Sequence, residues 1–570
     1  MRSRRSTGGT PTSRLSEAPP LVGAEALAGA VAATRDTMSV SAWTAVSRVS
    51  GVARVAVIGA VLGPTFFGNT FQFTNSLPNL VYFGFLAGSL FSSLLIPALV
   101  RHIDQGDRTS TERVAGGFLG FTFLGLLVVA PLLILVVPPV LGLAAGTPGS
   151  VAADQEHVAR LLLLMLLPQV FLYGVVGSAS AVMYARHRFA LAAAAPALEN
   201  FGMIAVLLAT GAVFGTDHAL GGVPTGELLL LGFGATGSVA LHAGAQWWGA
   251  RRAGVTLVPR AGWRDPEVRE IVRRTAPSLI QSGLIAVQTL FMLFVVNRVP
   301  GGIVALQMAL NFYYLPIAVV VTPVAVSLLP RLARLHMMSE PELFRDTLVR
   351  GWRFAMFLVV PAVVGYLALA WPIARTVSIG KMDSNDGIGL VAVAIIALAV
   401  GMLGQTTFTI ATQALYSRKD TRTPLLSMCL QALLCLILVS AALAFKDRDV
   451  LAIAGIGFSL AGLVGAAHVT FRLRHSLAGG MEDVLASIIK VTIGAIAMFF
   501  PARLVSEIVP TWVDGRVGEL TGLLCAAVVG FAVFLGIQAL LRTPELALAR
   551  ASFSRRGSVR MGDHETNHHE

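Results

Sequence analysis

The chain alternates long apolar runs with short polar segments along almost its whole length. Fourteen runs are long enough to cross a bilayer, which takes about 20 helical residues. Because each run is continuous, the runs indicate helices and not the alternating strands of an outer-membrane barrel. The pattern predicts an all-α polytopic membrane protein with about fourteen transmembrane helices. The runs fall near residues 39–62, 77–100, 115–141, 159–183, 191–214, 227–249, 275–298, 302–329, 354–377, 388–415, 424–444, 450–471, 484–503 and 518–541.

The charge of the connecting loops gives an independent check on this count. Every second loop is basic, and the loops between the basic ones are neutral, acidic or balanced; loop 64–76, for example, carries no charge. Lys and Arg concentrate in cytoplasmic loops, and a miscounted helix would invert the alternation downstream. We therefore expect an even number of spans in the bacterial cytoplasmic membrane, with both termini cytoplasmic. The basic loops are 101–113, 185–189, 251–274, 331–353, 417–422 and 472–475.

Two short patterns recur at nearly the same offset. The second and eighth runs end in similar Ser-Leu-Leu segments, with Pro97 and Pro330 separated by 233 residues. The fourth and tenth end at Tyr184 and Tyr416, separated by 232 residues, each followed by a basic segment. Since six spans is an even number, the repeat predicts two parallel six-helix halves around a central cavity, where transporters place their substrates. The last two helices would be an addition to these halves.

This organisation divides the chain into six parts. The first and last, which are polar and poor in large apolar residues, are expected to be a disordered arm and a tail, both cytoplasmic. The parts are a disordered arm 1–37, an N-terminal half 38–250, a basic linker 251–274, a C-terminal half 275–475, two additional helices within 482–541 and a tail 542–570.

The composition agrees with a membrane protein and excludes several functions. The chain is 55% hydrophobic and 13% charged, whereas a soluble domain is about 25% charged. The formal charge of +12 fits cytoplasmic loops, so no nucleic-acid partner is implied. Cys429, Cys435 and Cys525 lie in apolar runs and suggest no disulfide or metal framework. No phosphate-binding loop or nucleophile–base set stands out, so we expect no enzyme, cofactor or metal.

Two arginines interrupt the first apolar run. Arg48 and Arg54 lie in a segment with no other charge, where an unpaired cation costs about 2.5–3.5 kcal/mol. Ser47, Ser50, Gly51 and Arg54 share one helical stripe. This small, polar and cationic face favours a helix that lines a wet cavity and meets an anion there. The structural alternative is that the arginines snorkel to the surface or pair with a carboxylate.

Further polar residues lie inside the apolar runs. Gln307, Asn311 and Tyr314 align on the eighth run. A single stripe of this kind is more typical of hydrogen bonds between helices than of a substrate site, although several together favour a hydrated interior. Glu199 lies within the fifth run. It could be a proton-coupling group or the partner of an arginine, and the sequence does not choose between these roles.

Three segments carry a resemblance to a known family. Ser47–Arg54 is similar to S-R-[VL]-x-G-x-x-R on the first helix of the MurJ/MviN family, and Leu77–Leu80 to its L-P-N-L motif. Tyr416–Pro424 resembles its Y-[AS]-R-x-D-[TI]-[RK]-T-P loop. The family flips lipid II, the lipid-linked peptidoglycan precursor, and belongs to the multidrug/oligosaccharidyl-lipid/polysaccharide exporter superfamily. The resemblance covers roughly residues 38–541.

The resemblance implies roles for particular residues. Arg48 and Arg54 would bind the pyrophosphate of the substrate, because guanidinium forks suit phosphate oxygens. Asn69, Gln307 and Asn311 would line the cavity. The two additional helices near 484–541 would offer an apolar groove to the lipid tail.

Several family charges are absent from this chain. The family has an Asp at the position of Asn69, an arginine pair at Tyr82 and Phe83, A-E-G at Leu86–Gly88, and an arginine at Asn311. A site with fewer cations should hold a pyrophosphate less tightly or accept a different head group.

The sequence thus predicts a flippase that moves a polyprenyl-pyrophosphate-linked glycan, first of all lipid II, across the cytoplasmic membrane by alternating access. An ion gradient or the membrane potential would supply the energy. One alternative is an exporter of another lipid-linked polysaccharide or of a drug. Another is a non-transporting scaffold for cell-wall synthesis. The expected partners are the lipid-linked glycan, membrane lipids, and cell-wall synthesis or division proteins.

Overall fold

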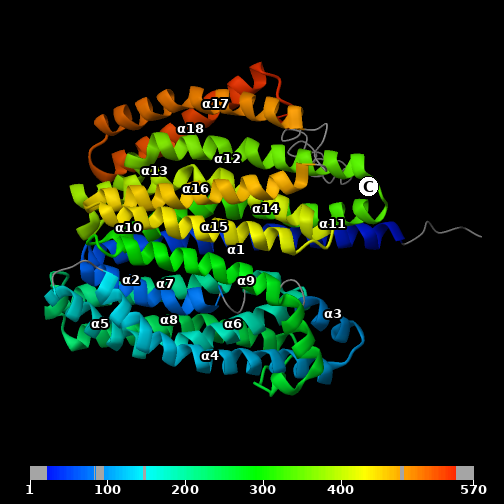
Figure 1. Ribbon diagram of the computed structural model, residues 1–570, viewed down its shortest axis with the longest axis horizontal. Helices are drawn as coiled ribbons and strands as arrows, with labels where there is room; N and C mark the ends of the chain where they lie inside the picture. The colour runs from blue at the N-terminus through cyan, green and yellow to red at the C-terminus, as the bar shows by residue number, and fades with distance from the viewer. Residues whose placement is uncertain (1–21, 83, 85–94, 145–148, 475–480, 547–570) are drawn as a thin grey trace, which may run out of the picture.

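The computed structural model describes residues 22–82, 84, 95–144, 149–474 and 481–546, and the regular elements in these ranges are helices (Figure 1). The N-terminal set is α1 Val22–Leu62, α2 Phe66–Val81, α3 Ile96–Asp104, α4 Arg108–Ala144, α5 Gly149–Leu166, α6 Pro168–Ala185, α7 Phe189–Phe214 and α8 Thr225–Arg252. The next set is α9 Pro266–Val296, α10 Gly302–Pro316, α11 Thr322–Met337, α12 Pro341–Val377, α13 Asn385–Ala399, α14 Gly401–Ser417, α15 Arg422–Ser440 and α16 Asp447–Leu473. The chain continues with α17 Met481–Ile508 and α18 Gly515–Leu540.

The number of spans agrees with the predicted architecture as far as the described residues reach. Twelve helices are long and apolar enough to cross a membrane, and α13 with α14 forms a thirteenth span bent by 41°. The predicted second run, 77–100, contains residues 83 and 85–94, which lie outside the described residues. The chain is therefore an all-helical multi-pass membrane protein.

The prediction of a loop at 64–76 is wrong, because helix α2 begins at Phe66. The hydroxyl of Thr65 caps the helix by accepting a hydrogen bond from the Gly68 amide at 3.0 Å. Phe67 and Phe71, one helical turn apart, are both buried in the core. The segment lacks charge because it is packed inside the protein, not because it is a neutral extracytoplasmic loop.

The predicted repeat is visible in the way the helices pack. Helix α7 packs against α1 and α8, and α15 packs in the same way against α9 and α16. Likewise α6 packs on α8 as α14 packs on α16. The two bundles lie side by side, with α2–α8 on one side of α1 and α10–α18 on the other (Figure 1). Helices α17 and α18 pack on each other and on α12, as an addition to the C-terminal bundle.

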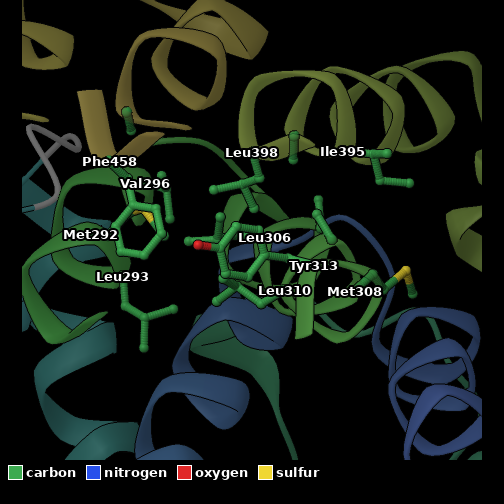
Figure 2. Packing of buried hydrophobic residues seen from close by; sticks show 14 of the residues in the cluster. Met292, Leu293, Val296, Leu306, Met308, Leu310, Tyr313, Ile395, Leu398 and Phe458 are labelled. Carbon is green, nitrogen blue, oxygen red and sulfur yellow. The ribbon is translucent and has the colours of Figure 1, made fainter. Parts of the chain in front are cut away.

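A continuous apolar cluster fills much of the C-terminal bundle and extends to α1, α2, α5, α7 and α8. Figure 2 shows side chains of α9 and α10, among them Met292 and Leu306, meeting Leu398 of α13 and Phe458 of α16. The hydroxyl of Tyr313 lies 3.4 Å from the carbonyl oxygen of Gly401 and donates to it. This bond falls at the bend between α13 and α14, where the helical hydrogen-bond pattern is interrupted.

Candidate functional site

A cavity of about 260 Å³ lies between the two bundles. Its walls come from α1, α2, α6 and α7 on one side and from α9 and α10 on the other. The residues that line it are Arg48, Arg54, Gln72, Asn75, Ser76, Asn79, Leu80, Tyr173, Glu199, Ile285, Thr289, Gln307, Leu310, Asn311 and Tyr314. The predicted central cavity between two halves is thus present, and most of its lining is polar.

Both arginines of the first run line this cavity, but their surroundings differ. Arg48 is exposed and has no ion-pair partner among the residues that the structure describes. Arg54 is 22% exposed, and its Nη1 lies 3.2 Å from Oε1 of Glu199. Its Nε is buried with no hydrogen-bond partner among the described residues. Among the described residues Arg48 therefore has no ionic partner, while Arg54 is already paired with Glu199 and its Nε donor is unused.

Glu199 is the centre of a buried polar cluster. Its Oε1 accepts a hydrogen bond from the Tyr173 hydroxyl at 2.9 Å, in addition to the contact with Arg54. Its Oε2 lies 2.8 Å from Nδ1 of His242 on α8. Glu199 and His242 are both buried. The structure therefore gives Glu199 the role of arginine partner, one of the two that its sequence position left open.

The small polar stripe of α1, formed by Ser47, Ser50, Gly51 and Arg54, mostly faces α7 and not the cavity. Asn200 on α7 donates from Nδ2 to Ser50 Oγ at 2.9 Å and to the carbonyl oxygen of Ser47 at 3.2 Å. A Cβ on Gly51 would lie 3.7 Å from the same nitrogen. The expectation that this whole stripe lines the cavity is wrong, because its small residues allow α1 and α7 to pack closely. Of the stripe, Arg54 alone is among the lining residues.

Gln307 and Asn311 are brought to the cavity as predicted, together with Tyr314. Gln307 Nε2 donates across the cavity wall to Ser76 Oγ on α2 at 3.2 Å. Asn311 Nδ2 donates to the carbonyl oxygen of Gln307 at 2.8 Å. The contact between Gln307 and Ser76 therefore joins the two bundles at this wall.

The polar face of α2 was missed by sequence reasoning. Gln72, Asn75, Ser76 and Asn79 follow the i, i+3, i+4, i+7 spacing of one helical stripe and line the cavity. The signal was present in the sequence, but this segment was interpreted as a loop followed by an apolar span. A helical-spacing test on residues 66–81 would have found it.

Asn69 does not line the cavity, contrary to the prediction. It is fully buried, and its Nδ2 donates to the carbonyl oxygens of Val299 at 2.8 Å and Asn297 at 3.3 Å. Its Oδ1 accepts from the amide of Ile303, one of the first amides of α10, which have no partner within their own helix. Asn69 thus joins α2 to the α9–α10 turn. It connects the two halves at the end of the molecule where α2 and α10 begin.

The positions where the family resemblance expects arginines are uncharged here. Tyr82 is buried and stacks on Tyr173 with ring centroids 5.7 Å apart. Phe83 and Leu86–Gly88 lie outside the described residues. Asn311 faces the cavity as a neutral amide. Among the lining residues, Arg48, Arg54 and Glu199 carry the charges, which leaves one positive charge in excess.

Comparison with known proteins gives the same picture of the fold. A solved lipid II flippase MurJ in an inward closed conformation superposes with a TM-score of 0.68 at 16% identity, covering 88% of this chain and 98% of that chain. An inward-facing multidrug resistance MATE family transporter of the MOP superfamily gives a TM-score of 0.57 at 13% identity, covering 77% and 96%. At these identities the likeness concerns the fold.

Sequence comparison identifies the family. The probable lipid II flippase MurJ of Vibrio cholerae is 27% identical over 400 residues, which is 68% of this chain and 73% of that protein. The lipid II flippase MurJ of Burkholderia cenocepacia is 23% identical over 406 residues, 68% and 74%. The family model described as lipid II flippase MurJ matches residues 58–520, a range that begins after both arginines. The chain belongs to the lipid II flippase MurJ family and is a membrane transporter, not an enzyme.

Proposed function

We propose that this chain binds the head group of a polyprenyl-pyrophosphate-linked glycan in its central cavity and exposes it alternately to each side of the cytoplasmic membrane. Lipid II is the substrate that the family supports. The alternating charge of the loops supports cytoplasmic termini. The fundamental task is to carry a charged, hydroxyl-rich head group past the hydrocarbon core, which excludes polar groups.

The observation that carries this proposal is the pair of arginines in a polar cavity between two bundles. Each phosphate of a lipid-linked pyrophosphate bears a negative charge. Arg48 has no ion-pair partner among the described residues, and Arg54 lines the same cavity. Guanidinium groups donate two parallel hydrogen bonds to phosphate oxygens. Gln307 and Asn311 offer amide groups on the opposite wall, where hydroxyls of a glycan would bind.

The lipid tail needs to stay in an apolar environment while the head group crosses. We assign it to the surface of α17 and α18, which pack on α12 and expose large apolar side chains such as Phe500 and Val528. The tail would then remain in contact with lipid throughout transport.

Depletion of the protein with analysis of the lipid-linked precursors tests the substrate. The flippase proposal expects lipid II to accumulate on the cytoplasmic side. Accumulation of a different lipid-linked glycan would keep the mechanism and change the substrate. An unchanged precursor pool, with loss of division-protein recruitment, would favour a non-transporting scaffold instead.

Complementation tests the anion site itself. Variants Arg48→Ala and Arg54→Ala should insert in the membrane but fail to restore growth to depleted cells. Gln405→Ala on α14, whose side chain bonds Thr409 within its own helix, serves as a polar control outside the cavity lining. Full growth with both arginine variants would rule out the anion site.

A further inference from the structure

The Glu199 cluster has a property that anion binding alone does not require. His242 presents Nδ1 to a carboxylate oxygen at 2.8 Å, while its Nε2 is buried with no hydrogen-bond partner among the described residues. The facing carboxylate is already an acceptor for Tyr173 and Arg54, so Nδ1 carries the hydrogen. Nε2 therefore presents a bare lone pair, which is an available proton acceptor within the bundle.

The groups around this pair come from three other helices. Arg54 on α1 and Tyr173 on α6 contact the Glu199 carboxylate directly. Arg48 lies in the same cavity and is the other charged group in its lining. On the α2 side the neighbour is Tyr82, a neutral ring stacked on Tyr173. Arg54 is therefore the cation in direct contact with the buried carboxylate.

Anion binding changes the charge balance between Arg54 and Glu199. With the cavity empty, Arg54 and Glu199 neutralise each other. A phosphate that recruits the Arg54 guanidinium weakens or breaks that pair, and a negative charge is then left buried on Glu199. A buried carboxylate without a cationic partner is strongly disfavoured, and uptake of a proton beside it relieves this cost. The neighbouring imidazole is a suitable acceptor because its Nε2 has no hydrogen-bond partner among the described residues.

We propose that Glu199 and His242 form a proton-binding site linked to the anion site through Arg54. As Arg54 moves from Glu199 to the substrate phosphate, His242 Nε2 accepts one proton from water, and the imidazolium replaces the guanidinium as the cation of Glu199. Departure of the phosphate returns Arg54 to Glu199 and releases the proton. This inference rests on the proposed pyrophosphate site and adds a second ligand to it.

The linkage reduces the charge that the protein moves. With the proton bound, the substrate-loaded cavity carries one negative charge fewer during the change of access than it would without the proton. The proton therefore acts as charge compensation for the substrate.

Calorimetry on the full-length protein in lipid nanodiscs tests the proposal, with farnesyl pyrophosphate as the probe. Titrations in buffers of different ionisation enthalpy give the protons exchanged on binding. The wild type should take up about one more proton per probe than Glu199→Gln, since the proton exchange of the probe itself is common to both. His242→Gln should lose the same uptake, and Glu199→Asp should retain it.

The affinity of Glu199→Gln separates a proton site from a structural one. Removal of the carboxylate frees Arg54, so the probe should bind this variant at least as tightly as the wild type, with a weaker dependence on pH. A carboxylate that only supports the fold would give weaker binding in the variant. Gln431→Leu, on the corresponding helix α15, is the matched control and should leave the proton count unchanged.

Two results would overturn the inference, and they differ in their consequence. Equal proton uptake by the wild type and Glu199→Gln would exclude the linkage and leave the pyrophosphate site intact. No binding of the probe to the wild type would exclude the anion site, and the linkage with it.

Discussion

The two halves of the molecule place different chemistry at the same position of one scaffold. In the N-terminal half, Glu199 of α7 pairs with Arg54 of α1. In the C-terminal half, Gln431 of α15 donates from Nε2 to Oε1 of Gln288 on α9 at 3.3 Å. Since α15 packs between α9 and α16 as α7 packs between α1 and α8, the two pairs correspond. One half joins its helices with charges and the other with neutral amides.

The difference between the two pairs shows where this protein places a buried ion pair and where it places neutral amides. Gln288 and Gln431 are both buried and fill a packed interface. The Arg54 and Glu199 pair borders the cavity, where a partner from outside can reach it. Ion pairs in an apolar interior are often no more stabilising than neutral side chains. The charged pair is therefore placed where a substrate can exchange with one of its members, and the neutral pair where nothing needs to change.

The largest expected effect is on stability. Arg54→Ala should lower the free energy of unfolding by about 3–5 kcal/mol, because Glu199 is left as an uncompensated buried charge. Gln288→Ala should cost only about 1–3 kcal/mol, for an unsatisfied amide and lost packing. Denaturant unfolding in detergent micelles measures both. The double variant Arg54→Ala/Glu199→Gln should recover most of the loss, and failure to recover would contradict the charge explanation.

Arg48 sharpens the contrast between a paired and an unpaired arginine. Arg48→Ala should change the free energy of unfolding by less than about 0.5 kcal/mol, because the exposed side chain has no described ion-pair partner. It should nevertheless weaken farnesyl pyrophosphate binding by about 1.5–3 kcal/mol, the value of a charge-assisted hydrogen bond. Equilibrium binding and unfolding on the same preparation separate these effects. A large stability loss would mean that Arg48 is structural.

Asn69 links the halves directly, and its loss should change the balance of conformations. Asn69→Leu removes three hydrogen bonds that join α2 to the α9–α10 turn, at about 1–3 kcal/mol for the groups left unpaired. Spin labels at Ala219→Cys and Asn385→Cys, with the native cysteines replaced, should report longer distances between the halves. Asn75→Leu, on the same helix but facing the cavity, should leave the distances unchanged.

The smallest expected effect compares the starts of α15 and α7. The Asp420 carboxylate accepts hydrogen bonds from the amides of Arg422 and Thr423, whereas Arg188 at the start of α7 gives no side-chain cap. Asp420→Ala should cost about 1 kcal/mol, and Arg188→Asp should stabilise α7. Hydrogen exchange of the first turns measures both changes. Equal protection in the variants and the wild type would contradict the capping role.

The cap also has a pH dependence. Partial burial raises the pKa of Asp420, but the hydrogen bonds from Thr423 and the amide of Arg422 outweigh it, so the folded pKa lies below its ordinary value. The stabilisation is therefore complete above the unfolded pKa of about 4 and is lost as the pH falls through the folded value. The α7 start should show no matching loss over that range.

The sequence was most informative where a pattern is local. Apolar runs predicted the spans, and helical spacing correctly predicted that Arg54, Gln307 and Asn311 line the cavity. The role of Glu199 stayed open because its partner lies 145 residues away, a separation that no local pattern encodes. Asn69 was misplaced for a similar reason. It bonds backbone groups of a distant turn, and a sequence does not show which backbone groups a side chain will bond. Helix α2 was missed because a buried uncharged segment resembles a neutral loop.

The neutrality of Asn69 has an electrical consequence. An amide both donates and accepts, so this single side chain holds two carbonyl oxygens and one amide of the opposite half. An aspartate could only accept. Because the side chain carries no formal charge, a transmembrane voltage adds no net energy to this contact, whereas moving one elementary charge across the membrane changes the energy by about 2.3 kcal/mol per 100 mV. The Asn69 contact between the halves is therefore held without a direct contribution from the field, whereas the charges of Arg48, Arg54 and Glu199 lie at the cavity.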